Sequence, residues 1–266
     1  MITIKTEEQI KGMKEAGVIL CKTHLAIREI LRPGLTTLQV NQFAEDFMRY
    51  KDSIPAQLGY EGFPFALCCS VNDEVCHGFP NERKLEEGDI LSIDNVVNYK
   101  GYLADSCWSY GIGKLSPTDQ KLMEVTEKAL YLGVEAARVG NHLVDIGAAI
   151  QPYVESQGFS VVRQFVGHGI GTEMHEDPQV LHYVTKRRGV RLVENMVITV
   201  EPMINEGSWE VKVDDNEWTA RTIDGKKSCQ FEHTFAIRKD GPEILTEQKN
   251  TSLTPEEREW IRSRKL

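Results

Sequence analysis

Five residues whose side chains bind metal ions lie on or beside short apolar runs of this sequence. They are Asp94, Asp105, His168, Glu201 and Glu232. Apolar runs of this kind form buried strands, and an unpaired ionised carboxylate is costly to bury. Four carboxylates and one imidazole favour a hard or borderline divalent metal ion as their partner. The pattern therefore predicts a metal site.

The first two carboxylates flank a turn-like segment, residues 98–101, between two runs rich in strand-forming residues. With residues 99 and 100 at the tip of a hairpin, we expect Asp94 and Asp105 to face each other. Opposite residues of a hairpin have Cβ atoms roughly 4.5–5.5 Å apart, a spacing at which like charges repel. An acidic hairpin with hydrated side chains is the alternative for this pair alone. The three further ligand-type residues favour a metal ion between the carboxylates.

The composition is typical of a globular protein. The 266 residues, 41% hydrophobic and 27% charged, are enough to bury a full core. The net charge of -9 disfavours nucleic acid, and the sequence has no run of about 18 apolar residues that would indicate a membrane span. The N-terminus lacks the apolar core of a signal peptide, and the six cysteines lack C-x-x-C spacing. We therefore expect a cytoplasmic protein with reduced thiols.

The predicted elements repeat along the chain. Each half begins with two amphipathic helices, and the four helices are expected over residues 6–31, 37–50, 116–140 and 143–156. A strand that ends in a carboxylate follows each pair of helices, because residues 85–94 align with residues 192–201 at a constant offset of 107. Two such halves that face each other would bring all four carboxylates to one cleft.

This repeat predicts a single catalytic domain over residues 1–266. Its halves would cover about residues 1–115 and 116–250. The remaining segment begins with Thr254-Pro255, a helix start signal, so we expect a capped surface helix at the C-terminal end.

Six motifs occur in an order that is specific to one family. They are Ser70-Val71-Asn72 leading to Val75-Cys76-His77-Gly78, Ile93-Asp94 with Asp105, Gly167-His168-Gly169-Ile170-Gly171, His175-Glu176-Asp177-Pro178-Gln179-Val180, Glu201-Pro202-Met203, and Gln230-Phe231-Glu232-His233-Thr234. With them the chain resembles type I methionine aminopeptidases over almost its whole length. The resemblance implies an α+β pita-bread (creatinase/aminopeptidase) fold, in which two pseudo-symmetric halves form a curved antiparallel sheet with helices outside. The lack of a long N-terminal extension favours the short bacterial-type form.

The resemblance also implies roles for the site residues. The five ligand-type residues would hold two divalent ions (Mn, Fe, Co or Zn), bridged by Asp105 and Glu232. Glu201 would move a proton from the attacking water to the leaving amine, His175 would bond the developing oxyanion, and His77 would contact the leaving nitrogen. A loop histidine bonded to backbone is the alternative for the last two. We expect only structural roles for His24, His142, His182 and His233.

A narrow apolar pocket for methionine is expected beside the metals, because a thioether makes favourable contacts with aromatic edges. The positions that resemble its lining are Tyr60, Phe63, Cys68 and Trp218, with His77 at the rim. Gln57, Phe63 and Met174 depart from the residues usual in the family, which leaves the selectivity of the pocket open. Plain core packing is the alternative for Phe63 and Trp218. Positions that resemble a monovalent-cation site are Asn72, Glu74 and Ser228.

The activity that this resemblance implies is removal of the initiator methionine from nascent proteins and peptides, by attack of a metal-activated water on the first peptide bond. We expect a monomer that works near the ribosome, with no membrane and no specific nucleic acid as partner. A prolidase or Xaa-Pro aminopeptidase shares the fold and the ligands, and a non-catalytic binding protein of the same fold is a third alternative. The sequence does not distinguish a cell's principal enzyme from an auxiliary copy.

Overall fold

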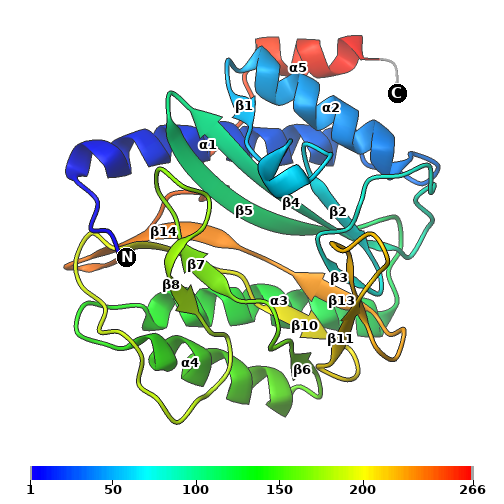
Figure 1. Ribbon diagram of the computed structural model, residues 1–266. Helices are drawn as coiled ribbons and strands as arrows, with labels where there is room; N and C mark the ends of the chain where they lie inside the picture. The colour runs from blue at the N-terminus through cyan, green and yellow to red at the C-terminus, as the bar shows by residue number, and fades with distance from the viewer. Residues whose placement is uncertain (1, 265–266) are drawn as a thin grey trace.

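The computed structural model describes residues 2–264. A central layer of strands is covered by helices on its outer faces, with α1, α2 and α5 on one side and α3 and α4 on the other (Figure 1). Within the described residues, no helix is both long and apolar enough to cross a membrane. Helices outside a strand layer agree with the expected fold.

Helix boundaries follow the capping residues closely. The helices are α1 (Glu7–Ile30), α2 (Thr37–Tyr50), α3 (Pro117–Ala136), α4 (Leu143–Ser156), α5 (Pro255–Ser263) and a short 3-10 helix, η1 (Tyr60–Gly62). Capping boxes at Thr6, Thr36 and Thr254 fix three of the starts. Helix α3 ends four residues before the predicted Gly140, because the Asn141 side chain donates to the carbonyl of Ala136 at 2.9 Å.

All strand pairs are antiparallel. The strands are β1 (Ile54–Pro55), β2 (Cys68–Val71), β3 (Glu74–Cys76), β4 (Ile90–Tyr99), β5 (Tyr102–Gly111), β6 (Ser160–Val161), β7 (Gly167–Gly169), β8 (Glu176–Val180), β9 (Val197–Val200), β10 (Met203–Asn205), β11 (Val211–Val213), β12 (Ala220–Thr222), β13 (Ser228–Gln230), β14 (His233–Arg238) and β15 (Gly241–Ile244). They form the ladders β1-β4-β2 with β5 beside β4, β13-β10-β6, β11-β12-β3, and β15-β14-β9-β7-β8.

Each half of the chain has its own apolar core. The first packs α1 and α2 against β2 and β4, with Phe47 fully buried, and the second packs α3 and α4 against β9 and β14, with Phe235 fully buried. Burial of such a side chain contributes about 1.5–3 kcal/mol. The strand layer between the two cores is therefore held from both sides. The six cysteines are all buried and free, as predicted for reduced thiols.

The last helix, α5, closes the outer face of the first half. Trp260 stacks on Tyr50 of α2 with ring centroids 5.1 Å apart and meets Phe47 edge-on. Glu257 is buried and accepts bonds from Lys22 of α1 at 2.8 Å and Lys51 at 2.6 Å. Although burial alone would raise it, the bonds from these two lysines hold the pKa of Glu257 below its usual value.

We expect Glu257→Gln to lower the free energy of unfolding by about 1.5–3 kcal/mol at neutral pH, since it removes charged hydrogen bonds. A carboxylate whose folded-state pKa is lowered stabilises the protein above its unfolded-state pKa, and this contribution is lost as pH falls through the folded-state pKa. Urea unfolding from pH 7 down to about pH 3 should therefore show the two proteins converging in acid. A gap that stays constant with pH would contradict this role for the ionised carboxylate.

Candidate active site

The β4–β5 hairpin carries two of the predicted ligands on one face. Its register pairs Asp94 with Cys107 and Asp105 with Val96, so the two carboxylates are diagonal neighbours rather than directly opposite. Asp94 also lies within β4 instead of ending it. The prediction was wrong because the tip is Lys100-Gly101, where both residues have positive φ (55° and 86°), the geometry of a tight two-residue turn. The diagonal pair is still close enough to interact.

Main-chain bonds between the halves bring Glu232 to Asp105. The Glu232 N–H donates to the carbonyl of Cys107 at 2.8 Å. The Thr234 hydroxyl donates to the carbonyl of Asp105 at 2.7 Å and lies 3.1 Å from its N–H. The predicted strand through Glu232 is broken, since β13 ends at Gln230 and β14 begins at His233. Glu232 lies in this break, with its carboxylate 1% exposed.

The remaining ligands come from β7 and from the residue after β9. His168 is the middle residue of β7, and a Cβ on either flanking glycine would lie within 2.6 Å of a backbone oxygen, at Thr199 or Asp177. The strands can therefore pack this closely only around glycine. Glu201 directly follows β9, as predicted, and its carboxylate accepts the Thr199 hydroxyl at 2.9 Å.

The arrangement of polar atoms fits a bound cation. Ligand atoms of Asp105, His168 and Glu232 all lie within 4.8 Å of one another. One carboxylate oxygen each of Asp94, Asp105 and Glu232 is buried without a hydrogen-bond partner among the described residues. His168 Nδ1 lies 2.9 Å from the carbonyl of Gly169, which can only accept, so the proton of the neutral ring is on Nδ1. The lone pair on Nε2 then faces oxygens of Asp105 and Glu201, each 3.6 Å away.

The pKa shifts of the clustered residues also favour a cation as their partner. Burial, and then the neighbouring carboxylates, raise the pKa values of Asp94, Glu201 and Glu232 well above normal. Burial also lowers the pKa of His168, so the ring has no stable positive charge to offer these groups. Such a buried cluster is neutralised either by protons on the carboxyl groups or by a cation, and a cation satisfies all the facing acceptor atoms at once. The cluster is therefore a candidate metal centre, as the sequence predicted.

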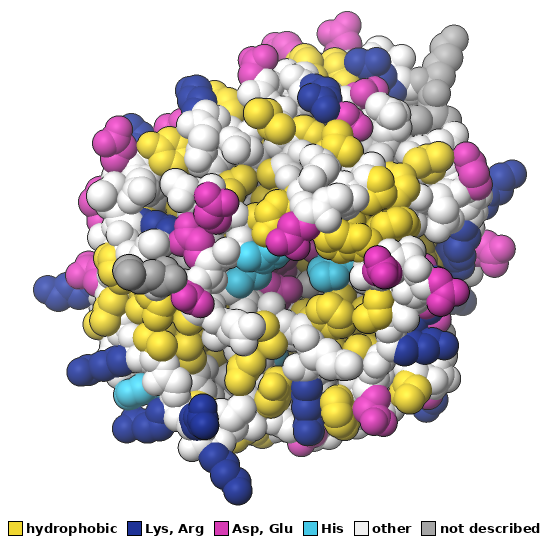
Figure 2. Space-filling view, in the orientation of Figure 1, with side chains coloured by type: hydrophobic (Ala, Val, Ile, Leu, Met, Phe, Trp, Pro, Cys, Tyr) yellow, Lys and Arg dark blue, Asp and Glu magenta, His cyan; other side chains and the backbone are white. Residues whose placement is uncertain are grey.

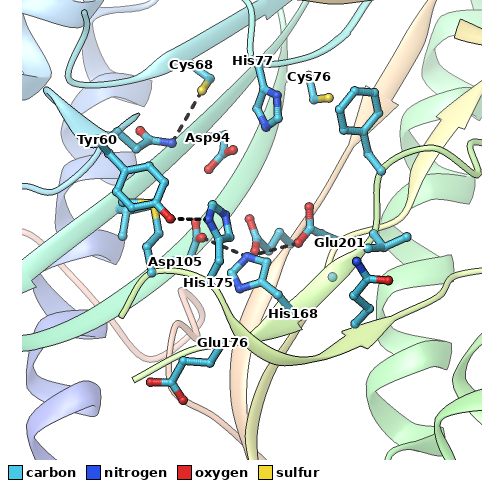
Figure 3. A pocket seen from close by; sticks show the side chains of 18 of the residues that line it. Tyr60, Cys68, Cys76, His77, Asp94, Asp105, His168, His175, Glu176 and Glu201 are labelled. Carbon is cyan, nitrogen blue, oxygen red and sulfur yellow. Dashed lines mark hydrogen bonds and ion pairs between the residues drawn. The ribbon is translucent and has the colours of Figure 1, made fainter. Parts of the chain in front are cut away.

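A cavity of about 810 Å³ opens above this cluster. In Figure 2, histidine side chains lie in a hollow bordered by hydrophobic side chains, and Figure 3 shows His77, His175, Asp94 and Glu201 directed toward a common space. All predicted pocket residues line the cavity: Gln57, Tyr60, Phe63, Cys68, His77, Met174, His175 and Trp218. The structure thus places them together, whatever their individual roles.

His77 and His175, which line the cavity beside the ligand-type His168, are neutral near pH 7. Burial, followed by the neighbouring His175, lowers the pKa of His77 to about 4. Burial, followed by His168, lowers that of His175 to about 4. His77 has a left-handed φ of 54° and packs edge-on against Phe165, with centroids 5.4 Å apart. The Tyr60 hydroxyl lies 2.9 Å from His175 Nδ1, so each ring has a fixed place at the cavity wall.

The apolar end of the cavity is built from aromatic and sulfur side chains. Phe63 meets Trp218 edge-on with centroids 5.2 Å apart. One terminal atom of the Gln57 amide lies 3.1 and 3.2 Å from the carbonyl oxygens of Asp94 and Ala66, so that atom is the nitrogen. The amide oxygen then faces Cys68 Sγ at 3.6 Å. Gln57 is therefore held against the strand that carries Asp94.

Several residues of the site were not predicted. His182 was expected to be structural, in agreement with its Nε2 accepting the backbone N–H of Glu201 at 3.1 Å, but its place beside a ligand was not predicted. The Gln230 amide donates to the Glu201 carboxylate at 3.3 Å. Phe165, Met203 and Gln230 line the cavity. His182 stands 19 positions before Glu201, a separation without local periodicity, and only the position of Gln230 two residues before Glu232 was a signal.

Comparison with known proteins relates this geometry to one family. The model of metallopeptidase family M24 matches residues 11–239. The chain is 47% identical to methionine aminopeptidase 1 of Bacillus subtilis over 246 residues, which cover 92% of this chain and 99% of that protein. The crystal structure of methionine aminopeptidase from Rickettsia prowazekii superimposes with a TM-score of 0.91 at 41% identity, over 93% of this chain and all of that chain. A Xaa-Pro dipeptidase from Bacillus anthracis matches with a TM-score of 0.75 at 25% identity, over 94% of this chain and 63% of its own.

Proposed function

The chain belongs to metallopeptidase family M24, and from this premise we propose that it is a methionine aminopeptidase. The reaction is hydrolysis of the first peptide bond of proteins and peptides that begin with methionine. One observation carries the proposal: a buried cluster of unpartnered carboxylate oxygens lies at the base of a cavity whose far wall is aromatic. The relatives with 40–47% identity over most of this chain carry the same name, and this supports the assignment.

Members of family M24 are metallopeptidases, and the site fits divalent metal ions. We infer that two ions bind, held by Asp94, Asp105, His168, Glu201 and Glu232, with Asp105 and Glu232 shared. The length of the cluster supports this, because the His168 ring lies between Asp105 and Glu201, 3.6 Å from an oxygen of each (Figure 3). Mixed carboxylate and imidazole ligands suit Mn, Fe, Co or Zn. When bound, such ions lower the pKa of a water molecule and polarise the scissile carbonyl.

The side chains of the cavity perform the remaining steps. Glu201, fixed by Thr199 and Gln230, accepts a proton from the attacking water and delivers it to the departing amine. With the Tyr60 hydroxyl donating to Nδ1, neutral His175 keeps its proton on Nε2 and donates it to the carbonyl oxygen as negative charge develops. His77, neutral and held by Phe165, bonds the nitrogen of the leaving peptide.

The aromatic wall selects the methionine side chain. Tyr60, Phe63 and Trp218 offer ring edges to the thioether, while Cys68 and Gln57 limit the depth. Because the Gln57 amide is already bonded to Asp94, Ala66 and Cys68, it offers the substrate little polar contact. An apolar, bounded pocket favours an unbranched thioether over shorter side chains.

We expect Met174→Phe to raise selectivity for methionine. The Met174 side chain is 6% exposed and lines the cavity next to His175, so an aromatic ring there adds a sulfur–aromatic contact worth about 0.3–1.5 kcal/mol. The ratio of kcat/KM for Met-Ala-Ser over Leu-Ala-Ser should rise by about 2- to 10-fold. An unchanged ratio would show that residue 174 does not contact the substrate side chain.

The test of the proposed function is release of the first residue from Met-Ala-Ser, Leu-Ala-Ser and Ala-Pro-Ser, followed by mass spectrometry. Metal-stripped protein is assayed with and without Mn, Fe, Co or Zn. Metal-dependent loss of methionine alone is the expected result. Cleavage before proline would move the assignment to the prolidases, with which this chain shares only 23–25% identity in the matched structures. No cleavage with any metal would favour a binding protein.

We propose nascent chains near the ribosome as the natural substrates. The loop between β8 and β9 carries four exposed cations, Lys186, Arg187, Arg188 and Arg191, in an otherwise acidic chain. Figure 2 shows Lys and Arg side chains below the central hollow, on the face that carries its mouth. Such cations can contact RNA phosphates without reading sequence. Co-sedimentation with ribosomes that falls with salt, and falls further when these four are replaced by Gln, is the expected result.

We infer a monomeric, cytoplasmic protein with one catalytic domain. Six free, buried cysteines support a reducing compartment. The order α1-α2-β4-β5 followed by α3-α4-β9-β14 supports two pseudo-symmetric halves, about residues 1–115 and 116–250, joined by the shared metal site. We also infer a monovalent cation at the backbone oxygens of Asn72, Glu74 and Ser228; the Ser228 N–H donates to the Asn72 carbonyl at 2.8 Å, and this bond brings the backbone of the two segments together.

A further inference from the structure

A buried lysine from the segment before α1 reaches the edge of the cavity. Lys5 is 5% exposed, and its Nζ lies 2.5 Å from Oε2 of Glu176 and also bonds the hydroxyl of Thr3. The Thr3 hydroxyl donates to the same oxygen of Glu176 at 2.5 Å. The Lys5 N–H donates to the carbonyl of Asn195 at 2.9 Å, which fixes this segment on the second half of the chain.

The other oxygen of Glu176 holds a tight turn. Oε1 accepts the backbone N–H groups of Thr172 at 3.1 Å and Glu173 at 3.4 Å. The next two residues are Met174 and His175, and both line the cavity. One carboxylate therefore connects the N-terminal segment to the turn that places the His175 ring, whose centroid is 4.5 Å from that of His168.

The ammonium group of Lys5 packs closely against the backbone of this turn at Gly171. A Cβ on Gly171 would lie 2.2 Å from Lys5 Nζ and 2.7 Å from Glu176 Oε1. The missing side chain of Gly171 thus lets the ammonium group and the carboxylate lie directly against the backbone of the turn. We call Thr3, Lys5 and Glu176 the N-terminal clamp.

We propose that Lys5 is a positioning residue for His175, acting through Glu176 in the N-terminal clamp. The proposal rests on the proposed function, because it concerns the residue that meets the substrate carbonyl. Glu176 is 9% exposed at its side chain, and a buried carboxylate that loses its counter-ion turns toward water. In doing so it would release the N–H groups of Thr172 and Glu173, and His175 would lose its place.

The first measurement is the kinetics of Lys5→Met, which keeps most of the side-chain volume and removes the charge. Misplacement of a reacting group by about 1 Å can cost up to about 100-fold in rate, so kcat should fall by about 10- to 100-fold. Because the oxyanion contact exists only in the transition state, kcat/KM should fall equally. Lys22→Met is the matched control, since Lys22 also pairs with a buried carboxylate, Glu257, but away from the cavity. It should keep wild-type kcat.

A double-mutant cycle separates positioning from general loss of stability. In the His175→Ala background, Lys5→Met should have little further effect, whereas a purely structural lysine would lower activity by the same factor in both backgrounds. Amide hydrogen exchange provides a readout without catalysis. The Thr172 and Glu173 amides should exchange faster in Lys5→Met, while amides of β14 should not change.

Equal losses in both backgrounds, or unchanged exchange at Thr172 and Glu173, would overturn the role of Lys5. If the wild-type protein releases no methionine, the proposed function fails. The exchange measurement still decides whether the N-terminal clamp holds this turn.

Discussion

Glu201→Gln, assayed at saturating metal, is expected to lower kcat for methionine release by about 10²- to 10⁴-fold. The substitution keeps the shape of the side chain and one oxygen that can accept from Thr199 or Gln230, but removes the group that accepts a proton. KM should change much less, since the proton moves only during the reaction. The measurement is steady-state kinetics on Met-Ala-Ser, with metal content determined for each protein.

The matched control is Glu210→Gln, which changes an exposed carboxylate after β10 and should leave kcat unaltered. Retention of more than a tenth of wild-type activity by Glu201→Gln, at full metal occupancy, would assign proton transfer to another group. The same conclusion would follow if Glu201→Gln bound less metal but kept the wild-type turnover per bound metal ion. Either result would leave Glu201 as a ligand only.

Metal-stripped protein is expected to gain stability when a divalent ion is added. The ion relieves repulsion among buried carboxylates and binds only the folded chain, so at 100 times Kd it should add about 2.7 kcal/mol to the free energy of unfolding. Urea unfolding with and without Mn or Co measures this directly. Asp105→Asn should lose most of the gain, because Asp105 lies together with His168 and Glu232 in the candidate metal cluster.

Without metal, Asp105→Asn should be at least as stable as the wild-type protein. The substitution removes one of the buried charges that have no cation to balance them. A metal-free wild type that is clearly more stable than this variant would show that the carboxylates are satisfied by protein groups alone. In that case the five residues would form a hydrogen-bonded cluster and not a metal centre.

The sequence predicted the parts of the fold that depend on local signals. The bounds of α2 and α4 were correct to the residue because apolar periodicity and flanking turns agree at each of them, with a capping box at the start of α2. The start of α5 followed from Thr254-Pro255. Of the five predicted ligand-type residues, Asp105, His168 and Glu232 form one cluster in the structure, and the role of the five as ligands stays a prediction.

The sequence did not predict the strand register of the hairpin or the contacts between segments far apart in the chain. The hairpin tip was predicted one residue too early, at Tyr99-Lys100 instead of Lys100-Gly101. The two candidate turns overlap in the sequence, and only the tolerance of glycine for positive φ distinguishes them. His182 and Lys5 carry no periodic signal toward Glu201 and His175, and their partners are fixed by packing between distant segments. The shape of the cavity likewise depends on how the two cores meet.

The ion pairs of Glu257 have a consequence for folding order. Lys22 and Lys51 belong to the first helices of the chain, but their carboxylate partner and the Trp260 ring arrive with the last one. During synthesis, part of the apolar surface of the N-terminal half therefore stays exposed to solvent until nearly the entire chain has been made. Contacts of such long sequence separation slow folding and leave early intermediates prone to association. A protein proposed to act on emerging chains would itself need protection while it emerges.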